Sequence, residues 1–235
     1  MPATGLFMKQ KTLAKCYTFE GKGLHTGGYA HMTLKPAQED TGIVFLRTDI
    51  GDGVRVAAVA ENVSNTARST TISSNGVSVV TIEHLMSALT GLGVDNALIE
   101  IDNAEVPILD GSALPYAKAI APDGLVEQDR DRKYITISEP VEVRDENTGS
   151  YVRIEPADRL SYDITVDFGS RVLGIQDVHW DLDLDYSTEI APCRTFVFFH
   201  ELEFLASKGL VKGGDVHGDQ HVGIGEYGGT DGIVG

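Results

Sequence analysis

The fold of this chain is decided at Val77-Ser78-Val79-Val80-Thr81-Ile82-Glu83-His84-Leu85, where a strand-like run leads directly into a helix-like run. We predict Thr81 as the N-cap of the helix, and Gly91 or Gly93 as the residue that ends it. Apolar residues recur with the i, i+3, i+4, i+7 spacing of a helix that buries one face: Ile82, Leu85, Met86 and Leu89.

An acid and an imidazole, Glu83 and His84, then lie together in the first turn of the predicted helix. Unpaired N–H groups and the positive end of the helix dipole favour an anion there and disfavour a cation. Glu83 is therefore expected to stay ionised, and His84 to stay neutral, the form that binds metals. A general base beside a metal ligand is what metal-assisted hydrolysis requires. On these two residues alone, the commoner interpretation is a carboxylate that suits a helix start beside a surface histidine.

Length and composition indicate a globular protein with one large domain or two small ones. The chain has 235 residues, of which 42% are hydrophobic and 23% charged. Its formal net charge of −16 argues against a nucleic-acid partner. No apolar run is long enough to span a membrane, and the first ten residues contain no secretory signal, so we expect a cytoplasmic protein. Cys16 and Cys193 form no C-x-x-C pair and are expected to be reduced thiols.

The first half of the chain predicts antiparallel strands with two helices, an α+β arrangement. A glycine-rich turn, Gly21 to Gly28, carries His25 and allows the backbone to approach another group closely. Asn75-Gly76 is a strong hairpin signal. We expect strands at 12–19, 31–34, 42–47, 54–60, 77–80 and 95–102, and a second helix at 114–120 capped by Asp110 or Ser112.

The second half repeats the order of strands followed by a helix, which weakly indicates an internal duplication. A charged segment, residues 123–133, is interpreted as a linker before it. From Gly213 onward the chain is dominated by glycine without an apolar period, so we expect a poorly ordered tail. Strands are predicted at 134–137, 141–144, 151–155, 162–168 and 177–186, and a helix at 196–208.

Five stretches, in this order, resemble one family: the zinc-dependent UDP-3-O-acyl-N-acetylglucosamine deacetylases of lipid A biosynthesis. Each stretch is weak alone, but the five together across residues 9–214 make a specific match and favour the catalytic interpretation of Glu83 and His84. The stretches are Gly23-Leu24-His25-Thr26-Gly27, Thr81-Ile82-Glu83-His84-Leu85, Gly91-Leu92-Gly93-Val94-Asp95-Asn96, Glu105-Val106-Pro107-Ile108-Leu109-Asp110-Gly111-Ser112 and Arg194-Thr195-Phe196.

The resemblance implies an α+β fold: a two-layer α/β sandwich of two similar sub-domains, the second incomplete here. We expect a first domain over 1–125, a partial second domain over 133–214, and a glycine-rich tail over 215–235. The implied reaction is hydrolysis of the 2-acetamido group of an acylated UDP-N-acetylglucosamine. It releases acetate on the way to the lipid anchor of Gram-negative outer membranes.

Roles for individual residues also follow from the resemblance. His84 resembles a zinc ligand, Glu83 the general base, and Thr195 the hydroxyl that holds the tetrahedral oxyanion. The remaining candidates bind substrate: His25 lines the sugar site, Asp167 and Phe168 match the uracil-contacting position, and Phe196 opens a segment to Gly214 that shapes a hydrophobic acyl passage.

The resemblance is incomplete at its C-terminal end. The family takes two more zinc ligands from a His-Lys-x-x-x-Asp helix and a general acid from a later histidine, and this sequence contains no such pattern. His217, Asp219 and His221 have a spacing that fits a metal, but fixing a glycine-rich tail would be entropically costly. We therefore expect the match to stop near Gly214, in a truncated or frame-shifted enzyme or a fragment, with weak or no activity.

Two alternatives remain. The first is a non-catalytic remnant of the same fold that binds a UDP-sugar and an acyl chain without a metal centre. The second is a metal-free hydrolase that uses Ser or Thr, which no G-x-S-x-G or S-x-x-K motif supports.

Overall fold

The computed structural model describes residues 8–171, 173–210, 212–213 and 233–234. The chain forms two compact units. Unit 1 combines Met1–Asp131 with Tyr186–Gly235, and unit 2 is Arg132–Asp185. Residues 186–213, which we predicted in a second domain, therefore belong to the same unit as the Glu-His motif.

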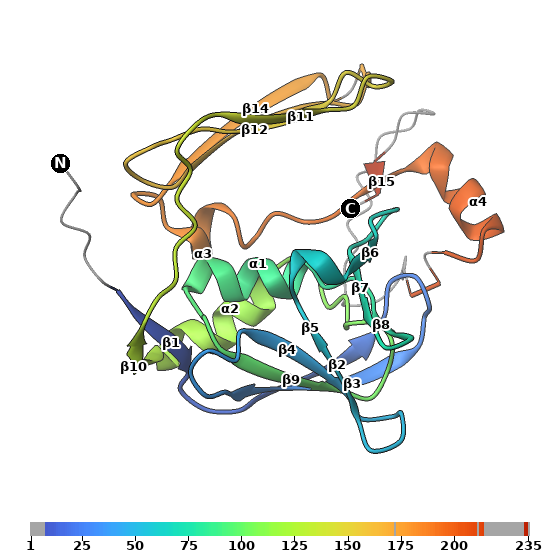
Figure 1. Ribbon diagram of the computed structural model, residues 1–235. Helices are drawn as coiled ribbons and strands as arrows, with labels where there is room; N and C mark the ends of the chain where they lie inside the picture. Colours follow the sequence, from blue (N-terminus) through green and yellow to red (C-terminus); the bar gives the residue numbers. More distant parts are fainter. Residues whose placement is uncertain (1–7, 172, 211, 214–232, 235) are drawn as a thin grey trace. The chain divides into compact units, whose positions relative to one another are not determined.

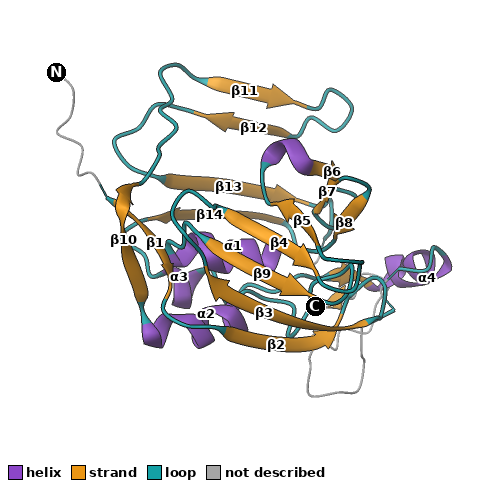
Figure 2. Ribbon diagram, turned by 60° about the horizontal axis from the view of Figure 1, so that its bottom comes forward, coloured by secondary structure: helices purple, strands orange, loops and turns teal. Residues whose placement is uncertain are grey.

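The centre of unit 1 is a five-stranded mixed sheet with the order β2-β3-β9-β4-β5 (Figure 2). All neighbours are antiparallel except β4 and β9, which run parallel. The predicted strand 12–19 is in fact two strands, β1 and β2. The strands are β1 (Lys9–Leu13), β2 (Tyr17–Lys22), β3 (Tyr29–Pro36), β4 (Ile43–Arg47), β5 (Val54–Ala57) and β9 (Ala97–Ile101).

Two helices, α1 (Glu83–Leu92) and α2 (Leu114–Ile120), cover one face of this sheet (Figure 1). Alternation along the strands turns every second side chain towards them. The core combines these strand residues with the apolar faces of both helices: Ala30, Met32, Leu34, Phe45, Ile99, Ile101, Leu85, Leu89, Tyr116 and Ile120 are all buried. Unit 1 is therefore a layer of helices on a sheet, and the predicted α+β class is confirmed.

A second sheet, with the order β6-β7-β8, lies before the Glu-His motif. Its strands are β6 (Val63–Asn65), β7 (Thr71–Ser74) and β8 (Val77–Val79), and short 3-10 turns occupy Ala60–Asn62 and Ala121–Asp123. Asn75 and Gly76 have φ values of 52° and 76°, as a type I′ hairpin turn requires, so the predicted hairpin is confirmed.

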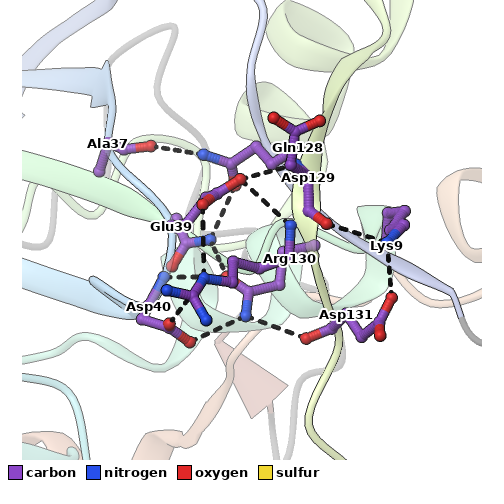
Figure 3. Close-up of polar contacts among 10 residues, drawn as sticks. Lys9, Ala37, Glu39, Asp40, Gln128, Asp129, Arg130 and Asp131 are labelled. Carbon is purple, nitrogen blue, oxygen red and sulfur yellow. Dashed lines mark hydrogen bonds and ion pairs between the residues drawn. The ribbon is translucent and has the colours of Figure 1, made fainter.

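The predicted linker 123–133 is wrong, because most of it is strand β10 (Leu125–Asp131), paired antiparallel with β1. The charges that indicated a linker instead fix the strand (Figure 3). The Glu39 carboxylate accepts the N–H groups of Asp129 and Arg130 at 2.6 and 3.1 Å. Lys9 donates to Asp131 at 2.7 Å. Composition cannot distinguish a solvated linker from an edge strand whose partners come from far along the chain.

Both glycines predicted at the end of α1 have a structural role, but only Gly93 ends the helix. Gly93 lies just past α1 with φ 85°, in the left-handed region that favours glycine. Gly91 lies inside the helix, where an added Cβ would overlap the ring of Tyr186. Tyr186 is buried and its hydroxyl lies 2.8 Å from that of Ser87. Gly91 thus allows α3 (Tyr186–Glu189) to pack on α1.

Gly91→Ala is therefore expected to destabilise the protein, although alanine favours a helix interior by about 1 kcal/mol. Because the new methyl group overlaps a buried ring, we expect a net loss of about 1–3 kcal/mol in urea unfolding. In a Tyr186→Ala background the same substitution should be neutral or stabilising. A destabilisation of equal size in both backgrounds would contradict this explanation.

Unit 2 consists of two hairpins, each amphipathic. They pair β11 (Val141–Arg144) with β12 (Tyr151–Ile154), and β13 (Ser161–Asp167) with β14 (Ile175–Asp181). The strand predicted at 134–137 is absent, because those residues pair with no other strand. One face of each hairpin is apolar: Val141, Val143, Val152 and Ile154 on the first, and Tyr162, Ile164, Val178 and Trp180 on the second.

None of the described residues of unit 2 is buried, and Val143 and Val152 are 71% and 68% exposed. Two-stranded hairpins are only marginally stable by themselves. Apolar faces left open favour association, so self-association of this chain remains a prediction.

The segment predicted as one helix, 196–208, is a short strand β15 (Val197–Phe198) followed by α4 (Phe199–Ser207). Strand β15 pairs with β16 (Ile233–Val234), which lies within the predicted tail. Cys16 and Cys193 are free and exposed, as expected. Within the described residues, no helix has the length and apolar character needed to cross a bilayer.

Candidate active site

The Glu-His helix begins at Glu83, one residue later than an N-cap at Thr81 implies, so the predicted cap is wrong. Ile82 occupies that position without a side-chain cap, and Thr81 has φ 60°. The Thr81 hydroxyl instead donates to the buried carboxylate of Glu105 at 2.8 Å. An N-cap would use the hydroxyl oxygen as an acceptor, whereas here the hydroxyl donates its proton to a charged carboxylate.

Glu105 is fully buried and joins the glycine-rich turn to the start of α1. Its carboxylate accepts the N–H groups of His25 and Thr26 at 2.9 and 2.8 Å, and the Thr26 hydroxyl at 2.7 Å. Burial by itself raises the pKa of Glu105, but these bonds and that from Thr81 favour the charged form and lower the pKa below its usual value. Glu105 is thus an ionised anchor beneath the site.

Glycine is required beside this anchor. A Cβ on Gly23 would overlap the Glu105 carboxylate, so the turn approaches the acid only because residue 23 has no side chain. The turn also contacts a glycine far along the chain: the Gly213 N–H donates to Leu24 O at 3.0 Å, and Gly213 itself has no room for a side chain. The close backbone approach predicted from the glycines is confirmed.

The first turn of α1 presents Glu83 and His84. The Thr70 N–H donates to the Glu83 carboxylate at 2.9 Å, which positions the acid from the loop between β6 and β7. Burial lowers the pKa of His84, and the charges of Glu83 and Asp110 only partly oppose this. His84 is therefore held as neutral imidazole, as predicted, chiefly through loss of hydration.

Thr195 is brought to this region by the loop that follows α3. Its N–H donates to Gly111 O at 2.9 Å, and the neighbouring Arg194 lies 3.6 Å from the Asp110 carboxylate. Thr195 is therefore bonded to the loop that carries Asp110, whose charge acts on His84. The predicted cap of α2 by Asp110 or Ser112 is wrong, because Ala113 occupies the N-cap position and no side chain caps the helix. The Ser112 hydroxyl accepts the Leu114 N–H at 3.1 Å from one position earlier.

His25 is buried beside the same loop that positions Glu83. Its Nε2 lies 3.2 Å from the carbonyl oxygen of Arg68, which can only accept, so Nε2 carries the proton. Nδ1 is then an acceptor, buried and without a hydrogen-bond partner in the described part of the chain. His25 is only 9% exposed, so its Nδ1 atom is enclosed by the fold without a protein partner among the described residues.

The other predicted substrate residues lie elsewhere. Asp167 and Phe168 belong to unit 2, where Asp167 accepts the Gly169 N–H at 2.8 Å and Phe168 is 51% exposed. Their contact with uracil stays a prediction. Phe196 belongs to unit 1 and packs edge-to-face on Phe198, with ring centroids 5.7 Å apart.

The described residues do not supply a complete metal site. No group of three or more His, Cys, Asp or Glu side chains in them is placed to hold a metal ion. A catalytic zinc normally has three protein ligands, and among the described residues His84 is the one that the family resemblance assigns to that role. His217, Asp219 and His221 lie outside the described residues.

Two functional residues were missed from the sequence. Glu105 was quoted within a family motif without a role of its own, and Arg68 was given no role. The signal for Glu105 was a carboxylate within an otherwise apolar Val-Pro-Ile-Leu context, where an acid is rarely placed unless it is paired. Nothing local to Arg68 indicates its contacts, because they come from Glu201 and His25.

Comparison with known proteins identifies the family of this chain. The family model described as LpxC, UDP-3-O-acyl N-acetylglycosamine deacetylase, matches residues 10–229, and so extends past Gly214, where we expected the resemblance to end. The UDP-3-O-acyl-N-acetylglucosamine deacetylase of Phenylobacterium zucineum is 44% identical over 214 residues, which cover 89% of this chain and 72% of that protein. The corresponding enzyme of Saccharophagus degradans is 43% identical over 215 residues, covering 89% and 69%.

A longer relative matches the same region. The bifunctional enzyme LpxC/FabZ of Porphyromonas gingivalis is 44% identical over 208 residues, 88% of this chain, and the chain spans 45% of its length. Since the family model covers most of the sequence and carries the Glu-His helix, the chain belongs to the UDP-3-O-acyl N-acetylglycosamine deacetylases, a family of hydrolytic enzymes.

Proposed function

We propose that this chain carries the site for hydrolysis of the 2-acetamido group of an acylated UDP-N-acetylglucosamine, in lipid A biosynthesis. The observation that supports this most is the meeting of three elements in unit 1. The start of α1 contributes Glu83 and neutral His84, the 110–111 loop contributes a nearby charge, and Thr195 is bonded to that loop. The names of the relatives specify the same reaction.

Each residue has a role that suits its position. Glu83, held by the Thr70 N–H, accepts a proton as water adds to the acetamide carbonyl carbon. The Thr195 hydroxyl donates to the oxyanion of the tetrahedral intermediate. When the C–N bond breaks, the proton on Glu83 is the one available to the leaving nitrogen, and acetate and a free amine result.

Substrate contacts complete this proposal. His25 lines the sugar site, where its unused Nδ1 accepts a hydrogen bond, and Asp167 and Phe168 contact uracil. Phe196 and α4 form the acyl passage, and Phe204 on α4 exposes 59% of its surface. We also propose a cytoplasmic location, where a UDP-sugar substrate is available.

Zinc is the cofactor that the family resemblance implies, and His84 is the residue that would hold it. A zinc ion would polarise the carbonyl and acidify water at this position. The described residues fit only one ligand position of such a site, and the 235-residue sequence lacks the His-Lys-x-x-x-Asp pattern. We therefore propose that this polypeptide by itself binds zinc weakly and turns over slowly.

This proposal predicts a specific result for the purified polypeptide. After dialysis against buffer without metal, zinc measured by mass spectrometry should be well below one ion per chain. With zinc sulfate present, slow acetate release from the acylated UDP-sugar should fall roughly 100- to 1,000-fold in Glu83→Gln, because the proton acceptor is lost. Glu61→Gln, a change at an exposed acid, is the matched control.

Two outcomes would contradict parts of this proposal. Acetate release that is equal in the wild-type protein and in Glu83→Gln would exclude Glu83 as the base. One zinc ion per chain that survives dialysis, and is lost in His84→Ala, would show that residues of this polypeptide complete the metal site.

The second candidate is a UDP-sugar-binding remnant, favoured by the absence of a three-donor cluster among the described residues. Calorimetric binding of the acylated UDP-sugar that is unchanged by a chelator, without acetate release at any zinc concentration, would favour it.

A further inference from the structure

The loop between β6 and β7, residues 66–70, contacts three parts of the candidate site; we call it the coupling loop. The Arg68 carbonyl accepts from His25 Nε2 at 3.2 Å. The Thr70 N–H donates to Glu83 at 2.9 Å, and the Thr70 carbonyl accepts the Ile82 N–H at 3.4 Å, just before α1. One short segment therefore positions both the proposed base and the proposed sugar-site histidine.

The same loop is tied to α4 by an ion pair. The Arg68 guanidinium donates to both oxygens of the Glu201 carboxylate, at 2.6 and 3.5 Å. Glu201 lies in the first turn of α4, and its carboxylate also accepts the Phe198 N–H at 3.4 Å. A guanidinium group pairs with a carboxylate in a fixed geometry. The ion pair therefore fixes the orientation of the Arg68 side chain relative to α4, in addition to balancing the two charges.

The backbone conformation of Arg68 depends on contacts such as this ion pair. Its φ is 65°, in the left-handed region that residues other than glycine rarely adopt. Such a conformation persists where contacts on either side hold it. At Arg68 these contacts are His25 on the carbonyl and Glu201 on the side chain, so loss of the ion pair allows the loop to relax away from Glu83.

We propose that Arg68 and Glu201 are positioning residues that couple the seating of an acyl chain on α4 to the placement of Glu83 and His25. This inference rests on the proposed function, in which α4 lines the acyl passage. When an acyl chain orders α4, the ion pair holds the coupling loop in place. The Thr70 N–H then keeps its hydrogen bond to the carboxylate of Glu83. A substrate without its acyl chain would leave the base less well positioned, which gives selectivity for acylated sugars without direct contact between chain and base.

Hydrogen exchange followed by mass spectrometry tests this coupling without requiring turnover. The probe is dodecanoate, a free fatty acid, added to the 235-residue polypeptide. In the wild-type protein, dodecanoate should slow exchange in α4 and, roughly threefold, in the coupling loop. In Glu201→Gln and in Arg68→Gln, dodecanoate should still slow α4 but no longer affect the loop. The charge-exchanged double variant R68E/E201R should regain the effect on the loop, and Glu61→Gln should behave as wild type.

The outcomes separate this inference from the function on which it rests. The coupling is excluded if dodecanoate protects α4 in the wild-type protein but leaves the coupling loop unaffected. It is also excluded if dodecanoate protects the loop equally in the wild-type protein and in Glu201→Gln. In both cases the assignment of α4 to the acyl passage is retained. If dodecanoate protects neither segment, the assignment of α4 to the acyl passage is wrong and the coupling is excluded with it. Protection of α4 in each variant also shows that the variant is folded.

Discussion

Glu105→Gln is expected to destabilise unit 1 by about 2–4 kcal/mol, although the substitution changes a single oxygen to an amide nitrogen. The carboxylate accepts four hydrogen bonds and is fully buried. A glutamine side chain can accept hydrogen bonds only at its carbonyl oxygen. Its NH2 group would then face either the two donors of Thr26 or the donors of His25 and Thr81. Buried donors without acceptors carry the full cost of lost hydration.

Urea unfolding at pH 7 measures this loss, with Glu100→Gln as the matched control. Glu100 pairs with Lys35 at 2.7 Å on a partly exposed strand surface, so its replacement should cost no more than about 1 kcal/mol. Equal effects of the two substitutions would show that Glu105 is not the anchor inferred from its contacts.

The pH dependence gives a second measurement on the same variant. The folded-state pKa of Glu105 lies below the ordinary value of 4.5, so its contribution to stability is complete above about pH 4.5. It is lost as the pH falls through the folded-state pKa, where the native carboxylate is finally protonated. The stability difference between wild type and Glu105→Gln should therefore shrink below pH 4.5. A difference that stays constant down to the acid unfolding transition would contradict an ionised Glu105.

Tyr116→Ala should cost about 3–5 kcal/mol, the other large effect we expect. The Tyr116 ring is fully buried on α2 and packs edge-to-face on Phe19, with centroids 4.8 Å apart. Its hydroxyl donates to the carbonyl of Pro107 at 2.8 Å, in the loop that leads to Asp110. Alanine removes the ring and leaves a cavity between helix and sheet.

Tyr116→Phe separates packing from hydrogen bonding, because it keeps the ring and removes only the hydroxyl. We expect about 1–2 kcal/mol for this variant, since the buried Pro107 carbonyl loses its partner. The thermal midpoint and urea unfolding of both variants provide the measurement. A phenylalanine variant as unstable as the alanine variant would place the energy in the hydrogen bond instead of the ring.

Several features of the site follow from short stretches of sequence. Apolar spacing places α1 correctly, so Glu83 and His84 lie in its first turn as predicted. Asn75-Gly76 forms its hairpin because positive φ at two adjacent residues has few alternatives. The ordered set of five motifs indicated the family, and the family model confirms it. These signals are local, or consist of residue types in a fixed order that can be read directly from the sequence.

Other features depend on residues that are distant in sequence. The Thr81 hydroxyl donates to Glu105 and does not cap α1. Residues 125–131 form a strand because they pair with the edge of β1. The assignment of 186–213 to unit 1 depends on Tyr186 fitting against Gly91.

By itself, the sequence determined the helix that carries the acid and the imidazole, the hairpin before it, and the family. Only the tertiary structure decided which buried carboxylate holds that helix, which charged segment joins the sheet, and which loop connects α4 to the base. The physical reason is that local spacing specifies backbone conformation. A buried charge or an unpaired strand edge is satisfied by whichever partner the folded chain brings within hydrogen-bonding distance.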